Sequence, residues 1–134
     1  MYTFENQIRV RYAETDRMNF VYYGNYASYF EVARVEALRN LGVSYKKMEE
    51  EGVMLPVLEY SVKYLRPAFY DDVLTIKTII PVLPSVKIVF NYEIYNADGQ
   101  KLNEATTTLV FISKETGKPC KGPTSLLDKL SAYF

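Results

Sequence analysis

The chain has 134 residues, and its 16 basic side chains equal its 16 acidic ones, so its formal net charge is zero. This balance argues against a basic nucleic-acid-binding surface and a polybasic membrane anchor, and the length fits one domain over residues 1–134. The absence of histidine excludes Ser-His-Asp and Cys-His catalysis and a zinc site built on imidazole.

A single cysteine, Cys120, cannot form a disulfide within the chain and favours a reducing compartment. Neither a signal peptide nor a membrane-spanning apolar run is visible. We therefore expect a cytoplasmic protein with no metal, no cofactor and no membrane insertion.

The first predicted element is a strand. Apolar and polar side chains alternate from Tyr2 to Tyr12, which is the pattern of a strand with one buried face. The stretch from Ala13 to Asn19 is irregular and polar, and it contains Asp16. The sequence thus places a lone carboxylate between a strand and the helix that follows.

The period changes to that of a helix at about Asn25, and the apolar positions keep helical spacing as far as Leu41. This helix is apolar enough that we expect most of it to be buried. Gly42 is a stop signal. Ser44 can cap a short second helix over Tyr45–Glu51.

Four more strands are predicted over Leu58–Leu65, Val73–Val82, Val86–Tyr95 and Lys101–Ser113. A hairpin turn at Asn96–Gly99 joins the last two, and a short helix over Leu126–Tyr133 ends the chain. Consecutive strands joined by short turns make an antiparallel sheet, and the one long helix must cover its buried face. The predicted fold class is α+β: a curled five-stranded antiparallel sheet wrapped around one central helix.

Two motifs stand out in this order of elements. The first is Tyr12-x-x-Thr15-Asp16-x-x-x-x-Val21-Tyr22-Tyr23-x-Asn25-Tyr26-x-x-x-Phe30-Glu31-x-Ala33-Arg34, and the second is Tyr64-x-x-Pro67-Ala68-x-Tyr70-x-Asp72. Together they resemble the hotdog-fold acyl-CoA thioesterases. The closest branch is the 4-hydroxybenzoyl-CoA thioesterase family, which includes the acyl-CoA thioesterases associated with the Tol–Pal system.

The resemblance implies that Asp16 is catalytic, as a nucleophile or as the general base for water. It also implies that the backbone N–H of Tyr23, helped by that of Gly24, binds the thioester oxygen. Physical chemistry supports both roles, because a helix N-terminus carries unpaired donors that stabilise an oxyanion. A thiolate leaves without a strong general acid, so one carboxylate and an oxyanion hole suffice in a chain that lacks imidazole. Tyr23 stands where the Tol–Pal branch usually has histidine, and Asn19 where the family often has glycine.

Most candidate residues also have a purely structural interpretation. Asp16 is a residue type that favours turns and helix N-caps, and its neighbour Glu14 is expected to be exposed. Glu31 either points into the acyl site or pairs with Arg34 one turn further along the helix.

The remaining candidates for substrate binding are aromatic or basic. The aromatic ones, which either contact substrate or only pack at the helix start, are Tyr22 and Tyr26. The basic ones, which either bind the phosphates of coenzyme A or lie on solvated strand faces, are Lys63, Arg66 and Lys87.

The first functional hypothesis is an acyl-CoA thioesterase that hydrolyses its substrate to the free acid and CoA. The alternative is a non-catalytic acyl-CoA or fatty-acyl binding or assembly module on the same fold. A hotdog dehydratase or hydratase is disfavoured, since those enzymes pair histidine with their carboxylate. Exposed edge strands need cover, so we expect a homodimer or homotetramer, and the resemblance implies an active site at the dimer interface.

Overall fold

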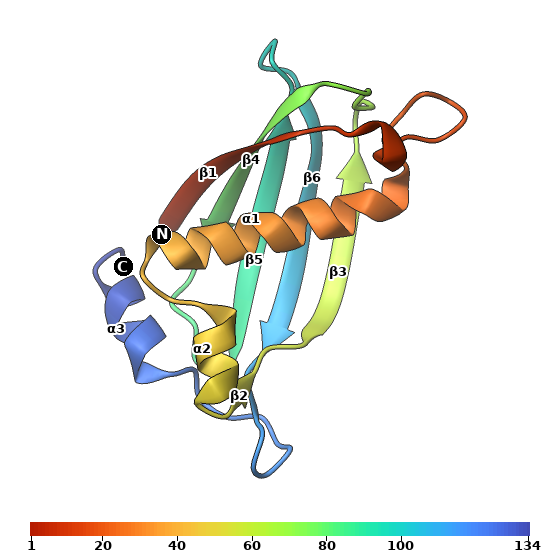
Figure 1. Ribbon diagram of the computed structural model, residues 1–134. Coiled ribbons are helices and arrows are strands. Elements are labelled where there is room, and N and C mark those ends of the chain that lie inside the picture. Colours follow the sequence, from red (N-terminus) through yellow and green to blue (C-terminus); the bar gives the residue numbers. More distant parts are fainter.

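The computed structural model describes residues 1–134 and consists of one antiparallel sheet with a long helix across one face (Figure 1). The strands of this sheet are β1 (Tyr2–Arg9), β3 (Val57–Tyr64), β4 (Val73–Ile80), β5 (Lys87–Tyr95) and β6 (Lys101–Val110). The helix is α1 (Tyr26–Asn40). This confirms the predicted α+β hotdog architecture with five strands.

The order of the strands, β1-β4-β5-β6-β3, corrects one prediction. We expected each of the last four strands to lie beside the next, but β3 pairs with β6 at one edge, whereas β4 lies between β1 and β5. The segment between Tyr64 and Val73 therefore passes from one side of the sheet to the other. Only β4–β5 and β5–β6 are hairpins. Pro67 in the crossing segment cannot supply a ladder hydrogen bond, which fits the end of β3 before it.

Helix α1 buries one face against the sheet. Its buried side chains are Tyr26, Tyr29, Phe30, Ala33, Arg34, Ala37 and Leu38. The ring of Phe30 is fully buried, with its centroid 4.6 Å from that of Tyr92 on β5. The opposite face, with Ala27, Glu31 and Val32, is exposed. The expectation of a helix buried on most sides is therefore wrong for the single chain.

The first helix ends and the second begins close to the residues that the sequence predicted. The chain leaves α1 through Gly42, whose φ of 82° lies in the left-handed region that glycine adopts without cost. Helix α2 (Tyr45–Glu50) begins after Ser44, whose hydroxyl accepts the N–H of Lys47 at 3.1 Å.

Other local features were not predicted. The short strands β2 (Val53–Met54) and β7 (Ile112–Ser113) pair with each other. The C-terminal helix, by contrast, is present as predicted, as α3, but it covers Thr124–Ser131 instead of Leu126–Tyr133. Tyr12, expected on the buried face of the first strand, is 77% exposed because β1 ends at Arg9 and the chain turns. None of the helices has the length and apolar character that crossing a bilayer would require.

The orientation of α1 generates a stability prediction. Phe30→Ala removes a fully buried ring and should lower the free energy of unfolding by about 3–5 kcal/mol. Val32→Ala, at a position that is 45% exposed, should change it by about 0.5 kcal/mol or less. Urea denaturation of both variants checks this. Equal losses would mean that the assigned buried face is wrong.

Candidate active site

Asp16 lies in a loop that returns to the start of the helix. The loop is closed by an antiparallel bridge between Thr15 and Val21 and by the N–H of Asp16, which donates to the carbonyl of Phe20 at 2.8 Å. At its tip Asn19 has a φ of 65°. Asparagine tolerates this left-handed conformation better than most residues, so the loop turns here without the glycine that is frequent in similar sequences.

The carboxylate of Asp16 is exposed in the single chain. Its Oδ1 accepts the N–H of Met18 at 2.8 Å, so the turn role that the sequence left open is present. Its Oδ2 accepts no hydrogen bond from the protein. One oxygen is therefore held by the loop, and the other is not.

Glu14 ties this loop to the helix. Its carbonyl accepts the N–H of Tyr22 and the side-chain amide of Asn25, both at 2.8 Å. Its carboxylate accepts the N–H of Arg11 at 2.8 Å and the hydroxyl of Tyr29 at 2.9 Å, and it forms an ion pair with the Arg11 guanidinium. The expectation that Glu14 is an exposed neighbour of Asp16 is wrong, since only 14% of its side chain is exposed.

These contacts set the protonation states of Glu14 and Tyr29. Burial disfavours the charged form of Glu14, but the hydrogen bonds from Arg11 and Tyr29 outweigh it and hold the pKa of Glu14 below its usual value. Burial, followed by the bond to the Glu14 carboxylate, raises the pKa of Tyr29 well above its usual value. Tyr29 therefore stays a donor and Glu14 an acceptor throughout the neutral range.

The donors expected at the helix start are available. A 3-10 turn, η2 (Tyr23–Asn25), runs directly into α1. The N–H of Asn25 donates to the carbonyl of Tyr22, and the N–H of Tyr26 to that of Tyr23, whereas the N–H groups of Tyr23 and Gly24 have no acceptor in the protein. The ring of Tyr22 lies over Gly24, where an added Cβ would be 2.6 Å from the ring.

A groove of about 250 Å³ opens beside these donors. It brings together three of the predicted site residues, Tyr23, Tyr26 and Arg66. The Tyr26 ring lies 5.4 Å from the ring of Tyr64 on β3, and most of the other lining side chains are apolar. The groove therefore suits an acyl group, with one guanidinium nearby for a negatively charged part of the ligand.

A second cavity, of about 200 Å³, lies further along α1, on the side that faces β3. Glu31 and Arg34 both line it, but they form no ion pair, so the predicted pairing along the helix is wrong. Arg34 is only 8% exposed, whereas Glu31 is exposed. The sequence pattern suggested a surface position for Arg34, although its spacing within the buried stripe of Phe30 and Leu38 was a usable signal of burial.

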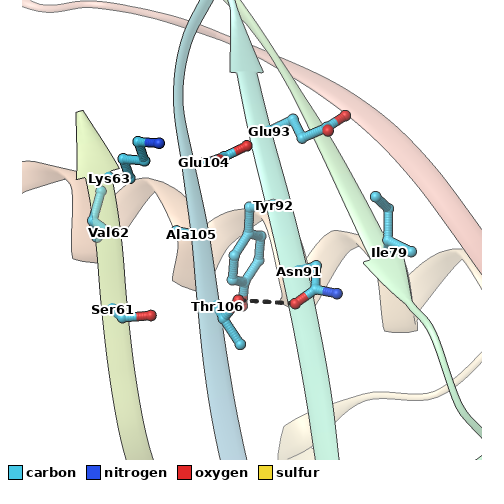
Figure 2. Close-up of a pocket in the computed structure, with 10 residues that line it drawn as sticks. All are labelled: Ser61, Val62, Lys63, Ile79, Asn91, Tyr92, Glu93, Glu104, Ala105 and Thr106. Atoms are coloured by element: carbon cyan, nitrogen blue, oxygen red, sulfur yellow. Dashed lines mark hydrogen bonds between the residues drawn. The ribbon is translucent and has the colours of Figure 1, made fainter. Parts of the chain in front are cut away.

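Two predicted binding residues lie away from this region. A cavity of about 500 Å³ has Lys63 among its lining residues. Figure 2 shows these residues on the outer face of the sheet, with the helix behind it. Since side chains alternate along a strand, Lys63 points away from the helix, while Tyr64 points toward it. Lys87 is exposed at the start of β5, opposite Val110, and lines neither groove beside α1.

The family model, the relatives and the solved structure that match this chain are all described as thioesterases or thioester hydrolases. The model of the thioesterase-like superfamily matches residues 10–130. A Bacillus subtilis protein named as a candidate acyl-CoA thioesterase, YneP, is 35% identical over 99% of this chain and 96% of its own length. The acyl-CoA thioester hydrolase YbgC of Escherichia coli O6:H1 is 35% identical over 90% of each chain. The crystal structure of a DHNA-CoA thioesterase from Staphylococcus aureus has 36% identity and a TM-score of 0.86, and the match covers all of this chain and 85% of that one.

Glu14→Gln tests the link between loop and helix. The variant should lose about 1–3 kcal/mol of unfolding free energy at pH 7, because the neutral amide accepts weaker hydrogen bonds than the carboxylate does. Folding lowers the pKa of Glu14, so its contribution is present above the unfolded-state pKa of about 4.3 and is lost as the pH falls through the lower folded-state value. The difference between parent and variant should thus shrink by pH 3.

Urea denaturation at both pH values measures this difference. Glu5→Gln is the matched control, since Glu5 is exposed on β1 and forms no ion pair. A difference for Glu14→Gln that stays the same at pH 3 would show that the ionised carboxylate does not hold the loop.

Proposed function

The chain belongs to the thioesterase-like superfamily, and from this premise we propose that it hydrolyses an acyl-CoA thioester to the free acid and CoA. One observation carries the proposal: Glu14 fastens the loop of Asp16 to the helix start, where the N–H groups of Tyr23 and Gly24 are unpaired. The names of the two relatives that are 35% identical support the same reaction.

In the proposed mechanism the thioester oxygen accepts the N–H groups of Tyr23 and Gly24. Negative charge that develops on this oxygen is stabilised by these donors and by the positive end of the helix. Asp16 either attacks the carbonyl carbon or removes a proton from water that attacks it. Attack by Asp16 expels the CoA thiolate and leaves a mixed anhydride, which water then cleaves to the acid and the regenerated carboxylate.

The groove beside the helix start suggests where the substrate lies. We place the beginning of the acyl group against Tyr26 and Tyr64, and the ring of Tyr22 at the entrance above Gly24. Arg66, exposed at the same groove, is the proposed contact for the phosphates of coenzyme A. Lys63 and Lys87 have no part in this arrangement.

One observation favours a second candidate function, a binding module without turnover. Asp16 is exposed, and one of its carboxylate oxygens is occupied by the N–H of Met18. Such a protein would bind acyl-CoA through the same groove and release it unchanged.

We also infer that the working protein is a homo-oligomer in which β3 is covered. β3 pairs only with β6, so its other edge is open, and it carries exposed apolar side chains. They are Val57, Leu58, Tyr60 and Tyr64. An open apolar edge is unfavourable in water, and both grooves described above are bounded by β3.

Asp16→Asn tests the catalytic assignment. The amide is a poor nucleophile and no base, so kcat should fall by about 100- to 10,000-fold, while the turn can persist because the amide oxygen still accepts the N–H of Met18. Steady-state hydrolysis of a panel of acyl-CoAs, with thermal unfolding, measures both effects. Asp98→Asn, at the exposed Asn96–Gly99 hairpin turn, is the control and should keep parental kcat. Parental activity of Asp16→Asn would reject Asp16, and binding without hydrolysis by the parent would favour the binding module.

Sedimentation tests the oligomer. The parent should be a dimer or tetramer at micromolar concentration. Leu58→Lys places a charge at the open edge and should shift the equilibrium toward monomer, whereas Val82→Lys, which changes an exposed side chain outside β3, should not. A monomeric parent, or equal effects of the two substitutions, would contradict the role of β3.

A further inference from the structure

Arg34 is a buried cation without a carboxylate. It is 8% exposed, forms no ion pair, and its Nε has no hydrogen-bond partner. A buried charge without a partner normally destabilises the folded state strongly. The position on the third turn of α1 could be filled by an apolar side chain, as it is at Phe30 and Leu38.

The surroundings of Arg34 keep it charged but do not satisfy it. Burial disfavours its charged form, yet the neighbouring hydroxyls of Tyr92 and Tyr45 more than offset this and raise its pKa. The hydroxyl of Tyr92 is already hydrogen-bonded to the hydroxyl of Thr107 at 2.7 Å. The hydroxyl of Tyr45 neighbours the guanidinium but forms no hydrogen bond, and the Nε of Arg34 has no acceptor. Arg34 therefore retains a donor for a further acceptor.

This donor belongs to a side chain that lines the 200 Å³ cavity. Thr107 and Tyr60 line it with Arg34, and Glu31 is the one carboxylate among the lining residues. Glu31 is exposed, so water screens its charge more strongly than that of the buried guanidinium. The interior of the cavity thus favours an oxygen acceptor.

We propose that this cavity receives the far end of the acyl group, and that Arg34 selects acyl groups which carry an acceptor oxygen, a carboxylate or a hydroxyl, at that end. The inference rests on the proposed thioesterase function and adds a substrate class to it. The guanidinium donates hydrogen bonds to this oxygen, and no covalent step is involved. Arg34 is a specificity residue that lies away from the reacting carbonyl.

Helix geometry limits the length of the acyl group. Arg34 lies eight residues beyond Tyr26, against which we place the beginning of the acyl group, and this corresponds to about 12 Å along α1. Its side chain leans back toward the helix N-terminus, which shortens the gap. An extended chain advances about 3.5 Å for every three single bonds, so the gap corresponds to fewer than about ten bonds. Acyl groups of short to medium length meet this limit.

Three acyl-CoAs of equal chain length test the proposal: hexanoyl-CoA, 6-hydroxyhexanoyl-CoA and adipoyl-CoA. In the parent, kcat/KM for at least one oxygen-bearing substrate should exceed that for hexanoyl-CoA by about 10-fold or more, as expected for a hydrogen bond to a charged group. In Arg34→Met, which keeps an unbranched apolar stem but removes the guanidinium, this ratio should fall to near one. Glu31→Gln should raise the ratio for adipoyl-CoA more than the ratio for 6-hydroxyhexanoyl-CoA, because it removes a negative charge at the cavity.

A parent that does not prefer either oxygen-bearing substrate would overturn the proposal, and would point instead to a carboxylate of a second copy as the partner of Arg34. Because this comparison of substrates uses the parent alone, it tests the proposal even if Arg34→Met does not fold. A preference that survives in a folded Arg34→Met would also overturn it. If the parent does not hydrolyse these compounds, calorimetric titration with the same three gives the ratio of Kd values. Absence of hydrolysis by the parent would therefore reject the proposed function, while the ratio of Kd values still tests Arg34.

Discussion

The hydrogen bonds of Glu14 are the constraint on which the rest of the site depends. The proposed reactive carboxylate and the proposed donors for an oxyanion come from different elements, a loop after β1 and the start of α1, and the proposed reaction needs them fixed within a fraction of an ångström. Glu14 joins the two through its carbonyl, which binds Tyr22 and Asn25, and through its carboxylate, which binds Tyr29. Because Tyr29 is buried in the core, its hydrogen bond to Glu14 fixes the loop relative to the packed helix.

The same contacts separate the roles of two carboxylates that lie only two residues apart. Glu14 is surrounded by donors and has a lowered pKa, so its lone pairs are occupied by structural hydrogen bonds. Asp16 keeps one oxygen free of hydrogen bonds and is exposed. Environment rather than residue type thus distinguishes the structural carboxylate from the one that we propose to be reactive. This division suits a chain without histidine, in which a carboxylate is the available base at neutral pH.

The spacing of apolar residues along the chain predicted most of the helices and strands. The features that were not predicted depend on packing between residues that are distant in the sequence. The alternation in β5 and the spacing in α1 gave the element types, and Ser44 and Gly42 gave the helix ends. The place of β3 beside β6 depends on contacts between distant residues, which turn signals do not encode. At the site, Asp16 and the helix start could be found from their motif. Arg34 was missed because spacing along the helix suggested a surface pair with Glu31, whereas burial against β5 and β6 decides its environment.

Helix α1 can carry both ends of the proposed substrate site because it is one rigid element. The unpaired N–H groups lie where η2 runs into it, and the buried guanidinium lies two turns further along. Phe30 lies between these positions and packs against Tyr92 and Tyr60, which holds this part of the helix against the sheet. The distance from the proposed oxyanion donors to Arg34 is therefore set by the helix and the turn that leads into it. A substrate whose oxygen lies at a different distance would gain less from Arg34, so the geometry of one helix couples the position of the reacting carbonyl to the choice of acyl chain.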